Sequence, residues 1–249
     1  MPVRPAGFVF IRVSDGLERG WGADAMPSIE ERLETVMEAP LDTLITSEHR
    51  SRPTRETVDS WRLPEADCRE LAERGLPDDQ FLTPVFQTDV EPALVPNVAG
   101  PRERELATAN ARLYELGRWG SHDLTPKIGA VENDGRVLAI RPAPFTAADV
   151  HPALREVYRD RYHPAVDFIN SSIAQLVQIS WRWRAAIPIL LELTEPSGPC
   201  SEEEINAYFA HREACEQIVL TGIERIDPAI RADDAARTLW GEVVTDPGC

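Results

Sequence analysis

Residues 168–183 read Phe-Ile-Asn-Ser-Ser-Ile-Ala-Gln-Leu-Val-Gln-Ile-Ser-Trp-Arg-Trp, and this stretch carries the clearest local signals in the chain. Ser172 followed three residues later by Gln175 predicts a capping box, in which each side chain binds the backbone N–H of the other residue. We expect a long, half-buried helix that begins at Ser172 and ends near Ile187, because Pro188 cannot donate to the helical hydrogen-bond ladder. The residues that share one helical face are Ile173, Leu176, Val177 and Ser180.

The composition is that of a soluble globular protein. The chain has 249 residues, of which 43% are hydrophobic and 27% are charged. This length suits one large domain, or one domain with an appendage. No run of about 18 apolar residues is present, so we expect no membrane span. The first residues, Met1-Pro2-Val3-Arg4-Pro5, lack the apolar region of a secretory signal, and we therefore expect a cytoplasmic protein.

The net charge of the chain limits the classes of molecule that we expect it to bind. The formal net charge is −16, which disfavours nucleic-acid binding because phosphate contacts need a basic surface. The stretch from Glu192 to Cys249 holds thirteen acidic and four basic residues, a balance of −9. Two solvated helix faces would account for this excess, and so would an acidic surface that faces a basic protein partner.

Polar composition divides the chain into two parts. Ser47–Arg55 is polar and has no apolar periodicity, so it is the best candidate for a linker. We therefore expect residues 1–55 to form an N-terminal appendage of a strand and a helix, and residues 56–249 to form the main domain.

Local signals predict three elements before the central sheet. Gly7–Val13 is apolar and rich in residues that favour strands. Ser28 and Glu31 have the spacing of a second capping box, which opens a helix. Residues 65–77 predict another helix, which Gly75 ends because glycine readily adopts positive φ at this position.

The middle of the chain predicts antiparallel strands. Phe81–Phe86 resembles an edge strand interrupted by a proline. Further on, Asp134-Gly135 lies between two runs that favour strands, which is typical of a type I′ hairpin with positive φ at both turn residues. The three antiparallel strands expected here lie within residues 112–117, 127–132 and 136–140.

The last third predicts two more helices. Ser201 and Glu204 have the spacing of a third capping box. Asp227-Pro228 would place a cap residue before a proline at the first helical position, opening a last helix through Trp240. The apolar stripe expected on the helix after Ser201 consists of Ile205, Tyr208, Phe209, Cys215, Ile218 and Val219.

Four segments, in this order, resemble the fourth group of the SUKH superfamily of bacterial immunity proteins. Together they span residues 60–245. They are Leu71–Pro77 with its Gly-Leu-Pro helix end, the strands Leu113–Gly117 and Ile128–Ile140 with their Asp-Gly turn, the Asn170-Ser171-Ser172 helix start, and Ile223–Pro228 followed by Trp240.

This resemblance implies both a fold and a function. The fold is α+β, with a central, mainly antiparallel sheet and helices packed around it. The function is that of a cytoplasmic antidote to a polymorphic toxin, often a nuclease or a nucleic-acid deaminase. Such a protein binds and blocks its toxin, and the family offers no catalytic residues to carry over to this chain.

The residues of the chain form no complete catalytic set. His122-Asp123 is the pair that an acid–base hydrolase would use, but no nucleophile accompanies it. Ser171 and Ser172 lie outside any G-x-S-x-G motif, and helix capping explains Ser172. No G-x-x-x-x-G-K or G-x-G-x-x-G pattern is present, so nucleotide binding has no support.

Metal binding is likewise not predicted. The histidines contain no H-x-x-x-H or H-x-H pair, and no cysteine is placed with a histidine at zinc-ligand spacing. We expect reduced thiols, no metal and no cofactor. The residues considered are His49, His122, His151, His163 and His211, with Cys68, Cys200, Cys215 and Cys249.

Three functions remain open from the sequence. The first is an immunity protein that occludes a basic toxin, with no nucleic-acid or membrane partner. The second is a regulatory or scaffold protein on the same fold, and the third is the hydrolase described above. For the first, the candidate partner-binding residues are Glu202, Glu203, Glu204, Trp181 and Trp183, an acidic helix start and an aromatic–basic patch.

Overall fold

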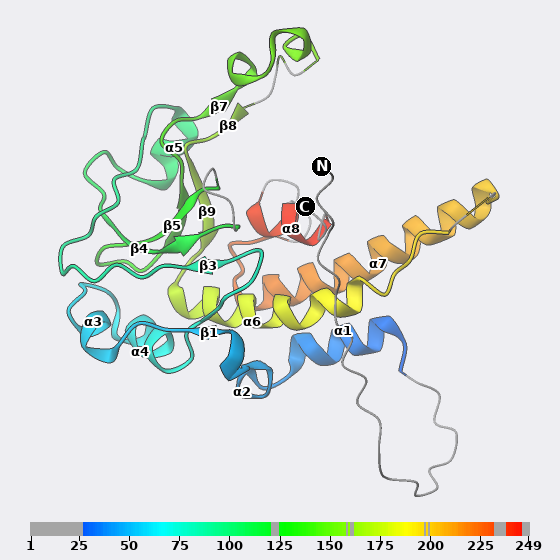
Figure 1. Cartoon of the computed structure of the whole chain (residues 1–249), viewed down its shortest axis with the longest axis horizontal. Helices are drawn as coiled ribbons and strands as arrows, with labels where there is room; N and C mark the ends of the chain where they lie inside the picture. Colours follow the sequence, from blue (N-terminus) through cyan, green and yellow to red (C-terminus); the bar gives the residue numbers. More distant parts are fainter. Residues whose placement is uncertain are drawn as a thin grey trace, which may run out of the picture.

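A five-stranded antiparallel sheet, in the order β3-β4-β5-β6-β9, lies at one side of the protein, on the left in Figure 1, next to the long helices. The computed structural model describes residues 27–120, 125–157, 159, 162–196, 198, 200–231 and 238–245. With the helices around it, the sheet confirms the expected α+β class. Its strands are β3 (Thr83–Pro84), β4 (Leu113–Arg118), β5 (Lys127–Val131), β6 (Val137–Ile140) and β9 (Val166–Asn170).

Eight helices are described. They are α1 (Ile29–Glu38), α2 (Leu41–Leu44), α3 (Arg55–Asp59), α4 (Glu65–Glu73), α5 (Pro101–Leu106), α6 (Ile173–Leu190), α7 (Glu202–Ile226) and α8 (Leu239–Thr245). The short elements are the 3-10 turns η1 (Ser47–His49), η2 (Ala147–Asp149) and η3 (Pro152–Leu154), and the strand pairs β1 (Arg50–Ser51) with β2 (Leu76–Pro77) and β7 (Phe145–Thr146) with β8 (Tyr162–His163). None of these helices is both long and apolar enough to cross a membrane.

The expected hairpin joins β5 to β6, but its turn differs from the prediction. Val131 N–H donates to the Arg136 carbonyl at 2.8 Å, which encloses a loop longer than two residues. The residues with positive φ are Asn133 (67°) and Gly135 (80°), whereas a type I′ turn at Asp134-Gly135 would need it at both. The strand β9 was not anticipated, and it pairs antiparallel with β6 at the sheet edge.

The sheet separates two apolar cores because strand side chains alternate between its faces. On β6, Val137 and Ala139 belong to the large core under the helices, whereas Leu138 and Ile140 belong to a smaller one on the opposite face. The small core is covered by the segment around Leu94 and by α5.

The helix α6 lies at the centre of the large core, with its start capped twice. Ser172 Oγ accepts from Gln175 N–H at 3.2 Å, as predicted, and Asp67 on α4 accepts from Ala174 N–H at 2.9 Å. The reverse half of the capping box is absent, since the Gln175 amide instead donates to the Ile226 carbonyl at 3.0 Å. Desolvation raises the pKa of the buried Asp67 carboxyl.

Pro188 does not end α6, contrary to the prediction. The helix continues through it to Leu190, and Ile189 and Leu190 are both buried. Leu191 N–H donates to the Ile187 carbonyl at 2.9 Å, so the ladder resumes after the proline. Burial of the last turn offsets the single hydrogen bond that proline removes.

The residues expected to open a last helix instead close a buried polar cluster. Asp227 ends α7, and its carboxylate accepts from the Asn170 side chain at 3.0 Å and from the Ser171 hydroxyl at 2.8 Å. Asn170 in turn accepts from Trp240 Nε1 at 3.1 Å. The described residues after Pro228 form a turn, and the next helix described is α8.

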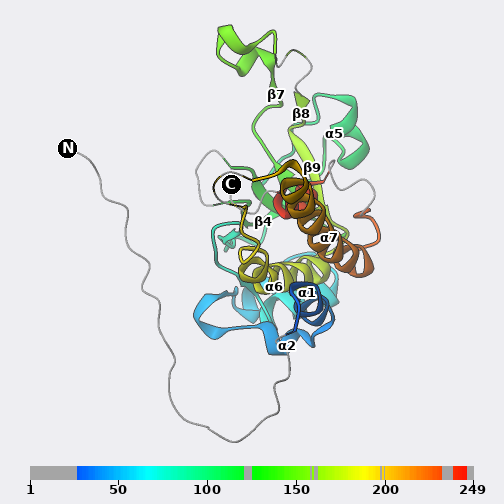
Figure 2. The same ribbon diagram turned by 90° about the vertical axis from the view of Figure 1, so that its right-hand side faces the viewer.

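The described part of the expected appendage packs into the main core. Leu33 is fully buried, and α1 contacts both α6 and α7, beside which it lies (Figure 2). The expected linker contains η1 and β1, and β1 pairs with β2. Residues 29–51 therefore share one core with the rest, while the predicted strand Gly7–Val13 lies outside the described residues.

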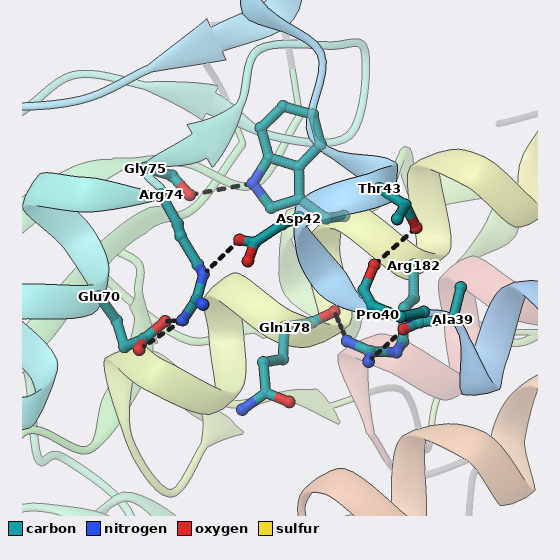
Figure 3. Close-up of polar contacts among 10 residues, drawn as sticks. Ala39, Pro40, Asp42, Thr43, Glu70, Arg74, Gly75, Gln178 and Arg182 are labelled. Carbon is teal, nitrogen blue, oxygen red and sulfur yellow. Dashed lines mark hydrogen bonds and ion pairs between the residues drawn. The ribbon is translucent and has the colours of Figure 1, made fainter.

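Two arginines, Arg74 at the end of α4 and Arg182 on α6, bind residues of the segment 29–51 (Figure 3). Arg182 on α6 donates to the carbonyls of Ala39, at the end of α1, and of Gln178, at 3.0 and 3.1 Å. Arg74 pairs with Asp42 on α2 and with Glu70 on its own helix. These contacts hold the end of α1 and the start of α2 against α6 and the end of α4.

Candidate functional site

The first half of α7 projects from the body of the protein (Figure 1). Every residue from Glu202 to Ala207 is exposed, and the first buried side chain of the helix is Cys215. The predicted capping box is present, because Ser201 Oγ accepts from Glu204 N–H at 3.2 Å and the Glu204 carboxylate accepts from Ser201 N–H at 2.8 Å. This box fixes the helix start at the outer end of the projection.

The outer end of α7 concentrates negative charge. Glu202, Glu203 and Glu204 occupy the first turn, where the helix dipole favours carboxylates. The backbone N–H and hydroxyl of Ser201 hold the pKa of Glu204 below its usual value. Within the described part of the chain, Glu202 and Glu203 take part in no ion pair, so their charges are available to a partner.

Apolar side chains lie beside these carboxylates. Ile205 and Phe209 follow each other at helical spacing and are 40% and 53% exposed. The Tyr208 ring meets the edge of Phe209, with ring centroids 5.3 Å apart. An exposed apolar patch with a charged rim is a typical protein-contact surface. We refer to residues 202–209 as the acidic tip.

The two tryptophans among the candidate contact residues lie in the core instead. Trp181 is fully buried and donates through Nε1 to the Gly75 carbonyl at 3.1 Å. Trp183 is 2% exposed and packs edge-on against Phe81. Neither ring can reach a partner, because α6 is enclosed on nearly every side. Of the candidate residues, only the three glutamates of the acidic tip remain on the surface.

The catalytic alternative gains no support from the geometry. His122 and Asp123 lie outside the described residues. The Ser171 hydroxyl donates to Asp227, and the Ser172 hydroxyl contacts the Gln175 side chain. Both serines therefore serve the helix start, and in the described residues neither has a histidine partner.

The structure brings together one group of side chains that could hold a metal ion, a group that was not predicted from the sequence. Glu30 on α1 and the residues His211 and Cys215 on α7 bring one ligand atom each within 4.8 Å of one another. The signal was the spacing of His211 and Cys215, since residues four apart share a helix face. Burial, with Glu30 and Glu216 nearby, raises the pKa of the Cys215 thiol to about 11.

Comparison with known protein families matches residues 36–246 to the SUKH-4 immunity protein family. The match covers most of the chain, from the last turn of α1 through the whole of α8. The chain belongs to the SUKH-4 immunity protein family. No curated protein and no solved structure matches it.

The sequence motifs that resemble SUKH-4 proteins form contacts inside the fold. The Asn-Ser-Ser segment and the closing Asp-Pro and Trp segments meet in the buried cluster of Asn170, Ser171, Asp227 and Trp240. The Gly-Leu-Pro segment provides the Gly75 carbonyl that binds Trp181. The motifs of this SUKH-4 protein thus maintain the fold, and the acidic tip lies apart from them.

Proposed function

We propose that this protein neutralises a basic polymorphic toxin in the cytoplasm by binding it through the acidic tip and occluding its active site. The observation that carries the proposal is the exposed start of α7, which places three carboxylates next to exposed apolar side chains on a member of an immunity protein family. A nuclease or nucleic-acid deaminase is the favoured class of toxin, because such enzymes bind phosphates through basic surfaces. An acidic protein can compete for that surface without performing chemistry.

Charge and apolar contact have separate roles in this proposal. The net charge of −16 attracts a basic domain from a distance and raises the association rate. Once the partners touch, buried aromatic and aliphatic side chains slow dissociation. Phe209 and Ile205 fit the second role because they are exposed in the free protein.

Charge removal at the tip tests the first role. The variant Glu202→Gln, Glu203→Gln, Glu204→Gln keeps the capping box, since glutamine can replace glutamate there. Its matched control is Glu56→Gln, Glu65→Gln, Glu73→Gln, which removes the same charge from exposed sites on α3 and α4 at the opposite end of the molecule (Figure 1). Association with a basic toxin domain encoded by a neighbouring gene, once such a domain has been identified, is followed by stopped flow at several salt concentrations.

The tip variant should associate several-fold more slowly than the control at low salt, and the difference should shrink as salt rises. At physiological ionic strength exposed charges are screened beyond about 8 Å. Equal association rates for the two variants would show that the acidic tip does not take part in the encounter with the toxin. If the wild-type chain neither binds nor protects cells against the neighbouring toxin, the antidote role is refuted and a scaffold with a different partner is favoured.

Truncation of the exposed ring tests the second role. Phe209→Ala should accelerate dissociation by about tenfold, since a well-packed aromatic anchor contributes more than about 1 kcal/mol. The association rate should hardly change because no charge is altered. Val157→Ala is the control, since Val157 is also exposed but lies far along the chain from α7. An unchanged dissociation rate for Phe209→Ala would place the contact elsewhere.

A further inference from the structure

We propose that Glu30, His211 and Cys215 form a zinc site that joins α1 to α7. The three residues provide a carboxylate oxygen, an imidazole nitrogen and a sulfur, and these ligand atoms lie within 4.8 Å of one another. Zinc binds these three ligand types, and three protein ligands with an open fourth position are a common zinc arrangement. This inference is independent of the toxin proposal.

The backbone already arranges the three side chains for a shared ion. His211 and Cys215 lie on the same face of α7, one turn apart, and Glu30 approaches from the first turn of α1. His211 Nε2 and Glu30 Oε1 are 2.9 Å apart. Bonds of about 2.0 Å to nitrogen and about 2.3 Å to sulfur place tetrahedral ligands about 3.5 Å apart. Small side-chain rotations therefore suffice to surround the ion.

Burial and charge also suit a divalent cation. Cys215 is fully buried, whereas His211 is exposed, so the site has a closed inner side and an open outer side. Zinc would form a bond to the Cys215 sulfur, and the thiol proton would pass to solvent. The thiolate and the Glu30 carboxylate together balance the two positive charges of the ion. The fourth position can hold a water molecule on the solvent side.

The position of the site gives it a mechanical role. Cys215 is the first buried residue of α7, so the ion would bind where the helix leaves the body. The opposite ligand belongs to α1, which packs along α7. Zinc would thus clamp the base of the acidic tip and limit its motion relative to the core.

Metal titration of the full, tag-free chain tests the site. The chain carries Cys200→Ser and Cys249→Ser to remove two further thiols, and ZnCl2 is added in competition with a zinc-sensitive dye. We expect one zinc ion per chain, and a thiolate-to-metal charge-transfer band when CoCl2 replaces ZnCl2. His211→Gln and Cys215→Ala should each weaken zinc binding by at least about tenfold, since even residues that only support a ligand contribute about 10- to 100-fold.

The controls separate this site from adventitious binding. Cys68→Ala removes a buried cysteine outside the site and His151→Gln an exposed histidine, and both should bind zinc as the parent does. His211 is exposed, so His211→Gln should keep the fold even if Cys215→Ala does not. Absence of stoichiometric zinc, or zinc binding by His211→Gln equal to that of the parent, would overturn the proposal.

Discussion

Buried polar side chains in this protein connect segments that are far apart in the chain. Arg182 is 8% exposed, and its hydrogen-bond partners among the described residues are the carbonyls of Met37, Ala39 and Gln178, with no carboxylate. The carbonyls of Met37 and Ala39 lie at the C-terminal end of α1, where the helix dipole favours a positive charge. Desolvation lowers the pKa of Arg182, so these carbonyls stabilise a charge that burial disfavours.

Removal of this guanidinium should therefore destabilise the fold. Arg182→Met keeps most of the side-chain volume but removes the donor from the buried Met37 carbonyl and from the part-buried Ala39 carbonyl, and the loss of a buried donor costs about 1–3 kcal/mol. We expect the free energy of unfolding to fall by at least about 2 kcal/mol in chemical denaturation. Arg225→Met is the control, because Arg225 forms an exposed ion pair with Glu38 and such pairs contribute about 0–1 kcal/mol. Similar effects of the two substitutions would show that Arg182 is not a structural link.

At the scale of elements, α6 and α7 differ in how much of their surface is buried. The helix α6 is buried on nearly every side, which places both Trp181 and Trp183 inside the core. The helix α7 is buried only from Cys215 onward, and its first turns carry the acidic tip. One helix therefore organises the core, and the other presents a surface.

Because α6 lies at the centre of the large core, shortening one of its buried side chains should lower the free energy of unfolding strongly. Leu176 is fully buried and belongs to the same core as Tyr114 and Ile128 of the sheet. Leu176→Ala should lower the free energy of unfolding by about 2–5 kcal/mol, from lost apolar burial and the remaining cavity. Ile205→Ala, at an exposed position of α7, should change it by less than about 1 kcal/mol. An unchanged melting midpoint for Leu176→Ala would contradict this position of the helix.

At the scale of the whole molecule, residues 29–51 are part of the main core. Deleting residues 1–50 removes Leu33 and Met37 from that core and the α1 carbonyls from Arg182. We expect the shortened chain to lose its cooperative thermal transition by circular dichroism, whereas Leu33→Ala in the full chain should remain cooperative and cost about 2–5 kcal/mol. A cooperative transition in the shortened chain would show that the segment is an appendage after all.

The sequence predicted features that depend on a few neighbouring residues. The capping boxes at Ser28 and Ser201 and the helix end at Gly75 are present because these signals act within one helical turn. The acidic start of α7 was predicted for the same reason. The buried state of Trp183 and the packing of α1 depend on distant segments, and no local pattern contains that information.

Asp227 shows this difference most clearly. Its position before Pro228 is typical of a helix start, yet its carboxylate binds Asn170 and Ser171, more than fifty residues away. A buried acceptor with several donors stabilises the fold more than an exposed cap does. Long-range hydrogen bonding therefore prevailed over the local preference.

The buried cluster around Asp227 also has a consequence for synthesis on the ribosome. Asn170 needs Asp227 and Trp240 as partners, and α1, made early, packs against α7, made late. The core can therefore close only after α8 has left the ribosome, because a chain folds as its segments become available. A nascent or prematurely terminated chain would leave Leu33 and Leu176 without their neighbours. Only finished copies of this immunity protein would then have a closed core, and truncated copies would be left with exposed apolar side chains.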